Sequence, residues 1–349
     1  MKIITAIIAL LVTFGAAADT LSRPQTTLAF VGDILMGTTF PETPRGAYLP
    51  ANDGRDLFNE CKEILQRVDV AAGNSETVFI NERQGEAKPC RNPQFCYTFR
   101  TPTSWAANLR EAGFDLMSIA NNHVNDFRRT GLQSTQLALR MAGVGYAGLR
   151  DCPTAVVVRN GKRIGFAAFG HSRNTANLND LDLVRRTVSS LDSVCDIVVV
   201  SFHGGEEGVK HTHVPFRTEA AFDEPRGNVH EFAHAAVDAG ADIVYGHGPH
   251  VNRAMELYRD RLIMYSLGNF CTPFRMNIAG ICGYAPLVEV TVDTDGSFIG
   301  GRIHPFIQRK GAGPRRDTSG AVVKNLQRLS LEDFPGNKLT IADDGRLSK

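Results

Sequence analysis

The chain has 349 residues, of which 43% are hydrophobic and 21% are charged, and this composition excludes a disordered, collagen-like or low-complexity protein. Its 38 lysines and arginines against 37 acidic residues leave a formal charge of +1, which argues against broad electrostatic binding to nucleic acid or to an acidic membrane. Any anionic partner is therefore expected to bind at a local site.

Residues 1–18 are predicted to be a signal peptide rather than part of the fold. Lys2 provides the positive start, residues 3–14 form an apolar core, and residues 16–18 are three alanines that resemble a cleavage signal. The alternative, a membrane anchor, is not favoured, because the apolar core is too short to span about 30 Å of hydrocarbon. We therefore expect an exported protein, periplasmic or extracellular, with no stable membrane anchor.

Strand and helix patterns alternate along the remaining chain. An apolar run at 27–31 predicts the first strand, and the periodicity of 57–68 predicts the first helix. The later segments are a strand at 68–72, a helix at 104–112, a strand at 115–120, a hairpin of 155–158 and 163–169, a helix at 181–191, a strand at 196–201, a helix at 229–239, a strand within 241–250, and strands at 261–266, 286–292 and 299–307. This order predicts an α/β protein with a mixed sheet or two packed sheets. One domain is expected over residues 19–310, with a tail at 311–349 that packs on the domain or frays from it.

One pair among the seven cysteines is placed for a local disulfide. Cys90 and Cys96 flank a short loop-like insert and could form a bond in an oxidising compartment. Cys61 and Cys195 lie in segments that predict small core residues instead. The odd count leaves at least one free or intermolecular thiol.

Polar residues collect at six predicted strand ends, where the strands themselves do not require them. These positions are Asp33, Asn74 to Glu76, Asn121 to His123, His203 to Glu207, His247 to His250, and Ser266 to Asn269. In open α/β sheets, ligands bind outside the carboxyl ends of the strands, so the six ends can converge on one pocket. Carboxylates, amides and imidazoles together suit a divalent transition ion such as Mn, Fe or Zn, and two of them can share such a site.

Each piece also has a purely structural interpretation. A single Asp after a strand is usually a cap or turn residue, paired Asn residues tolerate left-handed turns, and Gly-rich loops often only reverse the chain. His230 and His234 lie four apart on a predicted helix, but HEFAH is not the HExxH metal motif, so a solvent-facing or packing role is favoured for this pair. The coincidence of six strand ends with matching chemistry is what favours a common site.

The segments GDILMG, NSE, SIANNHVND, SFHGGEEG, GADIVYGHGPHV and LIMYSLGNF follow one another in the chain. Together they resemble the CapA/PgsA capsule-synthesis family, the poly-γ-glutamate group of the calcineurin-like metallophosphoesterase superfamily. The resemblance runs from about residue 28 to about residue 270. It implies a four-layer α/β/β/α sandwich with mixed sheets and a two-metal site at the strand ends.

The resemblance also implies roles for individual residues. The implied metal ligands are Asp33, Glu76, Asn122, His203, His247 and His250. His123 is expected to protonate the leaving group, and Asp126 to orient it. The residues expected to line the substrate pocket are Asn74, Glu207, Ser266 and Asn269. The chain departs from the usual superfamily pattern at Leu35, where a histidine is common, at Gly204, where many members have Trp, and at His250, which stands one residue late.

Three functions are compatible with these residues. The first is metal-dependent hydrolysis or transfer on an anionic γ-linked polymer or γ-glutamyl peptide, with two Mn, Fe or Zn ions as cofactors. The second is a non-catalytic export or assembly factor that works with capsule-synthesis machinery. The third is a conventional secreted metallophosphoesterase. No serine-hydrolase, P-loop or dinucleotide-binding motif is present, and no nucleic-acid partner is expected.

Overall fold

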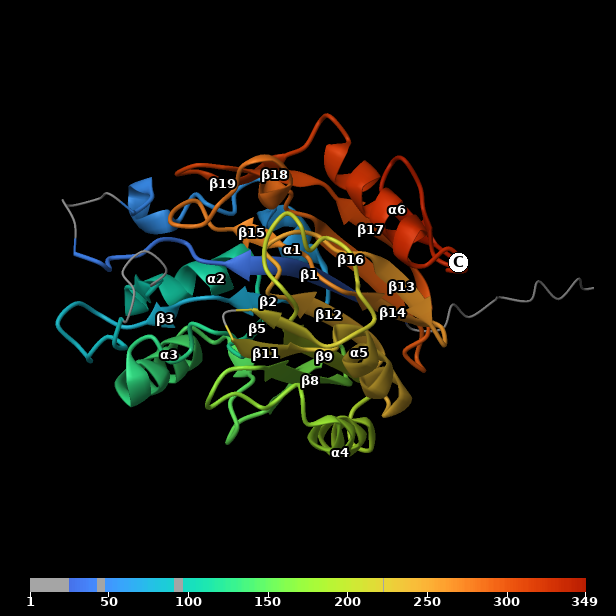
Figure 1. Ribbon diagram of the computed structural model, residues 1–349, viewed down its shortest axis with the longest axis horizontal. Helices are drawn as coiled ribbons and strands as arrows, with labels where there is room; N and C mark the ends of the chain where they lie inside the picture. Colours follow the sequence, from blue (N-terminus) through green and yellow to red (C-terminus); the bar gives the residue numbers. More distant parts are fainter. Residues whose placement is uncertain (1–24, 43–47, 91–96, 222) are drawn as a thin grey trace, which may run out of the picture.

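The computed structural model describes residues 25–42, 48–90, 97–221 and 223–349 (Figure 1). The predicted signal peptide lies outside these residues. Cys90 is disulfide-bonded, but its predicted partner Cys96 is also outside the described part of the chain. Among the described cysteines, the free thiols are those of Cys61, Cys152, Cys195, Cys271 and Cys282. No helix of the described residues has both the length and the apolar character of a membrane span.

Two mixed sheets form the centre of the molecule. The first has nine strands: β1 (Thr26–Ile34), β2 (Val70–Ser75), β5 (Leu116–Ser118), β6 (Gly145–Ala147), β15 (Asn269–Cys271), β16 (Leu287–Val292), β17 (Phe298–His304), β20 (Thr340–Ile341) and β21 (Arg346–Ser348). The second has six: β7 (Thr154–Arg159), β8 (Lys162–Gly170), β9 (Ile197–His203), β12 (Ile243–His247), β13 (Met255–Tyr258) and β14 (Arg261–Met264). Three small pairs lie outside them: β3 (Val78–Phe79) with β4 (Arg100–Thr101), β10 (Glu219–Ala221) with β11 (Glu224–Gly227), and β18 (Phe306–Arg309) with β19 (Gly313–Arg316).

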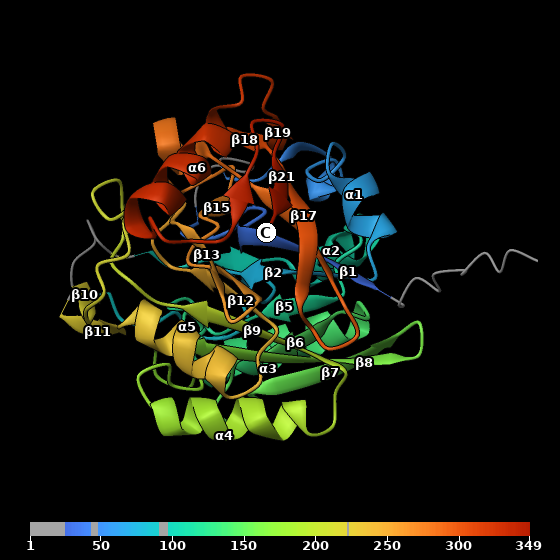
Figure 2. The ribbon, with the colours of Figure 1, turned by 90° about the vertical axis from the view of Figure 1, so that its right-hand side faces the viewer.

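Six helices of the described residues pack around the sheets, five on their outer faces and the last in the chain against the core between the sheets. They are α1 (Lys62–Arg67), α2 (Ala106–Ala112), α3 (Arg128–Met141), α4 (Leu181–Asp192), α5 (Val229–Asp238) and α6 (Ala321–Asp333), with short 3₁₀ turns at Ala51–Gly54, Thr103–Trp105 and Gly280–Gly283. Figure 2 shows α4 and α5 along the outer side of the second sheet. The caps are ordinary: Asp180 accepts from the Leu183 N–H at the start of α4, and Asn228 accepts from the Glu231 N–H at the start of α5.

Three hydrophobic cores separate four layers. Alternate residues of β1 show the arrangement, because Leu28 and Phe30 enter the core between the sheets while Ala29 and Val31 enter the core beneath α1 and α2. A third core lies between the second sheet and helices α4 and α5. The Phe30 and Tyr245 rings, from opposite sheets, meet at 4.8 Å in the central core. The predicted α/β/β/α sandwich with mixed sheets is confirmed.

The observed elements differ from the predicted ones in places where apolar spacing is a poor guide. Helix α1 covers only the second half of the predicted 57–68 segment, since residues 55–61 form turns. Helix α3, for which no element was predicted, buries small residues such as Gly131 and Thr135, which leave a weak hydrophobic pattern. Residues 311–349 contain α6, whose Val322 and Leu326 join the central core, and β21, which pairs with β17.

The sheet topology brings distant strand ends to one edge. In the first sheet β1, β2 and β5 are parallel neighbours, and in the second β8, β9, β12 and β14 are parallel neighbours. The carboxyl ends within each set therefore lie together. Tyr245 links the two sheets near these ends, because its hydroxyl donates to the Gly73 carbonyl at 3.4 Å.

A candidate metal centre at the strand ends

Strand register alone places four of the predicted site residues side by side in two pairs. Asp33 of β1 lies opposite Asn74 of β2, and His203 of β9 lies opposite His247 of β12. A bulge adds one residue to β1 between Phe30 and Asp33, a feature that re-aims side chains near functional sites. Two residues from each sheet thus reach the same edge.

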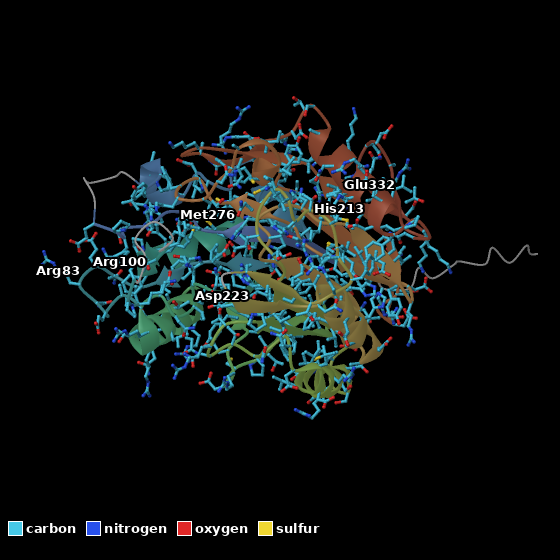
Figure 3. The ribbon with its side chains drawn as sticks, in the orientation of Figure 1. Arg83, Arg100, His213, Asp223, Met276 and Glu332 are labelled. Carbon is cyan, nitrogen blue, oxygen red and sulfur yellow. The ribbon has the colours of Figure 1, made fainter. Side chains whose placement is uncertain are left out.

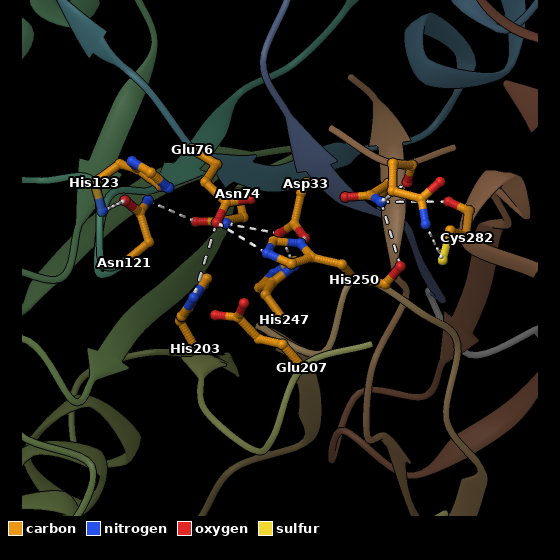
Figure 4. A network of polar contacts seen from close by, with 12 residues as sticks. Asp33, Asn74, Glu76, Asn121, His123, His203, Glu207, His247, His250 and Cys282 are labelled. Carbon is orange, nitrogen blue, oxygen red and sulfur yellow. Dashed lines mark hydrogen bonds and ion pairs between the residues drawn. The ribbon is translucent and has the colours of Figure 1, made fainter. Parts of the chain in front are cut away.

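Asp33 is the most heavily contacted carboxylate of the site (Figure 4). Its Oδ1 accepts a hydrogen bond from the Asn74 amide at 2.8 Å and lies 3.4 Å from the His247 Nδ1. Its Oδ2 lies 3.0 Å from the His250 Nδ1. Because the Asp33 side chain is fully buried, these polar contacts replace the water that it lost on folding.

Glu76 and His203 face the same space without hydrogen bonds of their own. The Glu76 Oε1 lies 3.9 Å from the His203 Nε2 and 3.8 Å from the His250 Nε2, which is too far for a hydrogen bond (Figure 4). Both carboxylate oxygens of Glu76 and both ring nitrogens of His203 are buried without a hydrogen-bond partner, as are both ring nitrogens of His247. Donor atoms of Asp33, Glu76 and His250 lie within 4.8 Å of one another.

The electrostatics of this cluster follow from burial and from neighbouring charges. Burial, reinforced by the Asp33 charge, raises the pKa of Glu76 well above its usual value. Burial lowers the pKa of His203 well below its usual value, which keeps the ring neutral. Burial alone would lower the pKa of His250, but the Glu76 and Asp33 carboxylates outweigh it and raise that pKa to about 10. Burial would raise the pKa of Asp33, but the polar contacts with the His247 and His250 rings outweigh it and lower that pKa.

These residues fit a divalent cation. A buried polar atom without a partner costs about 1–3 kcal/mol, so six such atoms on three adjacent side chains are expensive unless a ligand completes them. The donors are carboxylate oxygens and imidazole nitrogens, the set that Mn, Fe and Zn prefer. The Asn122 Oδ1 is a further buried acceptor without a partner. Asp33, Glu76, Asn122, His203, His247 and His250 would hold the metal.

Metal binding to this cluster is expected to release protons. The pKa of His250, raised to about 10, means that this ring holds a proton near pH 7 in the metal-free protein, and burial shifts the pKa of Glu76 in the same direction. A cation must displace protons from these groups to reach its ligands. Affinity should therefore rise with pH. Calorimetric titration with Mn²⁺ in buffers of different ionisation enthalpy should show release of at least about one proton. Equal binding enthalpies in all buffers would contradict this expectation. As a control, His123→Gln, which lies outside the ligand set, should release the same number of protons as wild type.

A chain of amides connects Asp33, a predicted metal ligand, to His123. The Asn121 amide nitrogen donates to the Asn74 Oδ1 at 3.1 Å and to the Ser75 carbonyl at 2.9 Å. The Asn121 Oδ1 accepts from the His123 backbone N–H at 3.1 Å, so the chain runs from His123 through both amides to Asp33 (Figure 4). Sequence reasoning assigned a role to Asn122 but none to Asn121, which positions its neighbours.

His123 and Asp126 form a buried pair beside the cluster. The His123 Nδ1 lies 2.9 Å from the Asp126 Oδ2, which also accepts from the Phe99 backbone N–H at 2.7 Å. The Lys88 ammonium lies 2.6 Å from the other Asp126 oxygen, and the Phe99 ring packs on the imidazole at 4.3 Å. These contacts fix the ring and leave its Nε2 to carry a proton that can be transferred.

Two residues that sequence reasoning missed complete the second-sheet side of the site. His171 directly follows β8, its Nδ1 lies 3.2 Å from the His203 carbonyl oxygen, and burial with the Arg226 charge lowers its pKa to about 4. The buried Arg226 guanidinium donates to the Glu207 Oε1 at 2.7 Å. His171 follows the strand sequence GFAAFG, so the same strand-end pattern was available for it. Arg226 comes from the β10–β11 hairpin, which carries no such pattern.

The remaining predicted pocket residues hold loops in place. The Ser266 hydroxyl donates to the Val251 carbonyl at 2.8 Å, and the Asn269 amide donates at 3.3 Å to the carbonyls of His250, Asn277 and Cys282. Asn74 is occupied by Asp33 and Asn121 in the same way. Substrate contact stays a prediction for these residues, whereas Glu207 points into the space between His203 and His247 (Figure 4).

Two departures from the usual superfamily pattern lie where the loops after β9 and β12 touch. The Gly204 N–H donates to the His247 carbonyl at 2.9 Å. A Cβ on Gly248, whose φ is 116°, would lie 2.6 Å from the Gly204 carbonyl oxygen, and a Cβ on Gly204 would lie 2.6 Å from the Arg226 carbonyl oxygen. A Trp at 204 therefore does not fit this backbone. In the loop after β12, the residue that contacts Asp33 is His250.

The four-layer sandwich, with a buried Asp, Glu and His cluster at its central strand ends, defines an α/β protein of the metallophosphoesterase-like fold class. The chain belongs to the family of bacterial capsule synthesis proteins called PGA_cap, whose family model matches residues 27–273. The predicted family resemblance is confirmed.

Relatives of this chain carry capsule-related names. The capsule biosynthesis protein CapA of Bacillus anthracis is 29% identical over 266 residues, which cover 70% of this chain and 59% of that protein. The PGA biosynthesis protein CapA of Bacillus subtilis is 29% identical over 264 residues, which cover 69% of this chain and 62% of that protein. The chain thus spans less than two thirds of either relative.

A solved structure is also similar to this chain. A phosphatase structure from Mycoplasma pneumoniae is 13% identical with a TM-score of 0.49, covering 82% of this chain and 94% of that one.

Proposed function

We propose that this protein is a metal-dependent hydrolase that cleaves a γ-linked glutamate polymer, poly-γ-glutamate or a related γ-glutamyl peptide. The observation that carries the proposal is the set of six unpartnered donor atoms on Glu76, His203 and His247, next to Asp33 and to the His123–Asp126 pair. A purely structural site would satisfy these atoms internally. The predicted signal peptide is consistent with a reaction outside the cytoplasm.

Charge supports an anionic substrate once metal is bound. Without metal, the Asp33 and Glu207 carboxylates face two cationic groups, the Arg226 guanidinium and the His250 ring, and burial disfavours the ionised form of Glu76. These opposite charges largely cancel, so the metal-free site offers a polyanion little attraction. Two divalent ions would add positive charge, and the site would then attract carboxylates. The capsule-related names of the relatives point to the same class of polymer.

The reaction divides between the metal and this chain's own side chains. The ligand set of Asp33, Glu76, Asn122, His203, His247 and His250 would hold divalent ions, which would lower the pKa of a water molecule and polarise the scissile carbonyl. The water loses one proton to the solvent and its oxygen adds to the γ-carbonyl carbon. The carbon–nitrogen bond then breaks, His123 gives its Nε2 proton to the departing amine, and the ring regains a proton from the solvent. Asp126 holds the Nδ1 proton of His123 and stabilises the protonated ring before transfer. Arg226 fixes the Glu207 carboxylate at the border of the site.

The test is incubation of the Mn²⁺-loaded protein with poly-γ-glutamate, followed by measurement of new amino groups and of polymer length. We expect chain shortening with one new amino group for each cleavage, and no cleavage after chelation. Tight polymer binding without new amino groups would contradict the proposal and support an export or assembly role. Cleavage of a generic phosphodiester with an intact polymer would contradict it in favour of a phosphoesterase.

A further inference from the structure

A second cluster of imidazoles and a carboxylate lies on the outer side of the second sheet. His230 and His234 are four residues apart on α5, so they share one face of the helix, and their ring centroids are 4.0 Å apart. Glu256 comes from β13, the edge strand of the second sheet. None of these residues belongs to the centre at the strand ends.

Glu256 is held in place by two neighbours. The His234 Nε2 lies 3.0 and 3.2 Å from the two Glu256 oxygens, and the Tyr265 hydroxyl donates to the Glu256 Oε2 at 2.7 Å. The His234 ring in turn stacks on Tyr258 at 3.7 Å. A carboxylate whose orientation is fixed by an outer hydrogen bond is the usual arrangement around metal-binding residues.

His230 completes the cluster without a hydrogen bond of its own. Neither of its ring nitrogens has a hydrogen-bond partner among the described residues, although the ring is held between Phe216 at 4.7 Å and Phe334 at 6.1 Å. One candidate ligand atom from each of His230, His234 and Glu256 lies within 4.8 Å of the other two. A cation placed among them would give His230 the partner that it lacks.

A cavity of about 510 Å³ opens onto this cluster and supplies room for water at a further ligand position. Its lining includes His230, Glu256, Tyr258, Phe334 and Asn337. Figure 1 shows α5 and β13 on the same side of the molecule as α6. Figure 3 labels His213 and Glu332 close together on this side, where the His213 Nδ1 also lies 2.6 Å from the Asp333 carboxylate.

We propose that His230, His234 and Glu256 form a second metal site, separate from the strand-end centre, which takes Zn²⁺ with water from the cavity as the fourth ligand. Two imidazoles and one carboxylate with an open position form a common zinc donor set. The site joins α5 to the edge strand β13, so the ion stabilises the packing of the helix on the sheet. This inference does not depend on the proposed hydrolase activity.

The same structure provides a matched control. His304 lies 2.8 Å from Glu289 in a second His–Glu pair, but there the additional neighbour is Arg67 rather than another imidazole. The cation of Arg67 excludes a metal ion from that pair. His304→Ala therefore removes an equivalent His–Glu contact without removing a metal site.

The experiment measures zinc stoichiometry in the full chain, with metal-free protein equilibrated against Zn²⁺ and analysed for bound ions. We expect His230→Ala to bind about one equivalent less than wild type, and His304→Ala to bind the wild-type amount. Tyr265→Phe, which removes only the hydroxyl that holds Glu256, should weaken this equivalent about tenfold. Because activity is not measured, failure of the hydrolase proposal leaves the result interpretable.

Equal stoichiometry in wild type and His230→Ala would overturn the second site, since the cluster would then be a packed aromatic patch with a His–Glu hydrogen bond. If His230→Ala does not fold, Glu256→Gln decides instead, because Gln keeps the shape and can still accept from Tyr265. Loss of about one equivalent in Glu256→Gln supports the site, and unchanged binding overturns it.

Discussion

We expect the Glu76→Gln protein to lose its metal and its turnover while the metal-free protein becomes more stable. Both Glu76 oxygens are buried without partners, so the wild-type chain carries an uncompensated carboxyl group whenever the cation is absent. Gln has the same shape, carries no charge and can donate to the adjacent acceptors. The gain should be about 1–3 kcal/mol in free energy of unfolding, measured by denaturant titration of chelated protein.

The stability difference between Glu76→Gln and the wild type should depend on pH. Burial raises the pKa of Glu76 above its unfolded value, so ionisation destabilises the folded state. Below about pH 4.5 the carboxyl is protonated in both states, and the wild type and the variant should differ least. As pH rises above that value, the advantage of Glu76→Gln should grow. Saturating metal should reverse the order, because only the wild type retains the ligand.

Glu289→Gln is the matched control with the opposite sign. The hydrogen bond with His304, with help from Arg67, lowers the pKa of Glu289 to about 2. Its ionised form therefore favours folding above the unfolded pKa, and the contribution is lost as pH falls towards about 2. Glu289→Gln should reduce stability near pH 7 and leave metal content unchanged. If Glu76→Gln instead destabilises the metal-free chain while Glu289→Gln behaves as expected, Glu76 is a structural residue.

The sequence was sufficient to predict which strands carry the site. Asp33, His203 and His247 each lie at the end of an apolar run, and such runs become parallel strands buried on both faces, so the carboxyl ends of the strands within each sheet lie together. No knowledge of side-chain packing is needed for this step. The hairpin at Asn160-Gly161 was equally accessible, because both residues adopt the positive φ that its turn requires.

The roles of neighbouring residues could not be predicted in the same way. Whether Asn121 or Asn122 joins the amide chain depends on the turn after β5, which places Asn121 against Asn74. Arg226 reaches Glu207 only because the β10–β11 hairpin folds back over the loop after β9. Contacts of this kind arise from tertiary packing, which a local pattern does not encode.

The second large effect is expected at His123, where replacement by Gln should reduce kcat about 10²- to 10⁴-fold without loss of metal. His123 makes its side-chain contacts with Asp126 and Phe99 rather than with the predicted ligands, so the ligand set survives the substitution. What is lost is the proton donor for the departing amine. Elemental analysis beside steady-state kinetics separates this result from that of Glu76→Gln, in which metal and turnover fall together.

The leaving group distinguishes proton donation from mere positioning by His123. In a γ-glutamyl nitrophenyl ester the leaving group is a nitrophenolate, a stable anion that needs no proton. On this substrate the rate of His123→Gln should therefore approach the wild-type rate. Asp126→Asn should follow the same trend with a smaller defect on the amide, because the introduced amide oxygen still accepts from the His123 Nδ1–H but no longer stabilises the protonated ring. An equal defect of His123→Gln on amide and ester would show that the residue shapes the site without donating a proton.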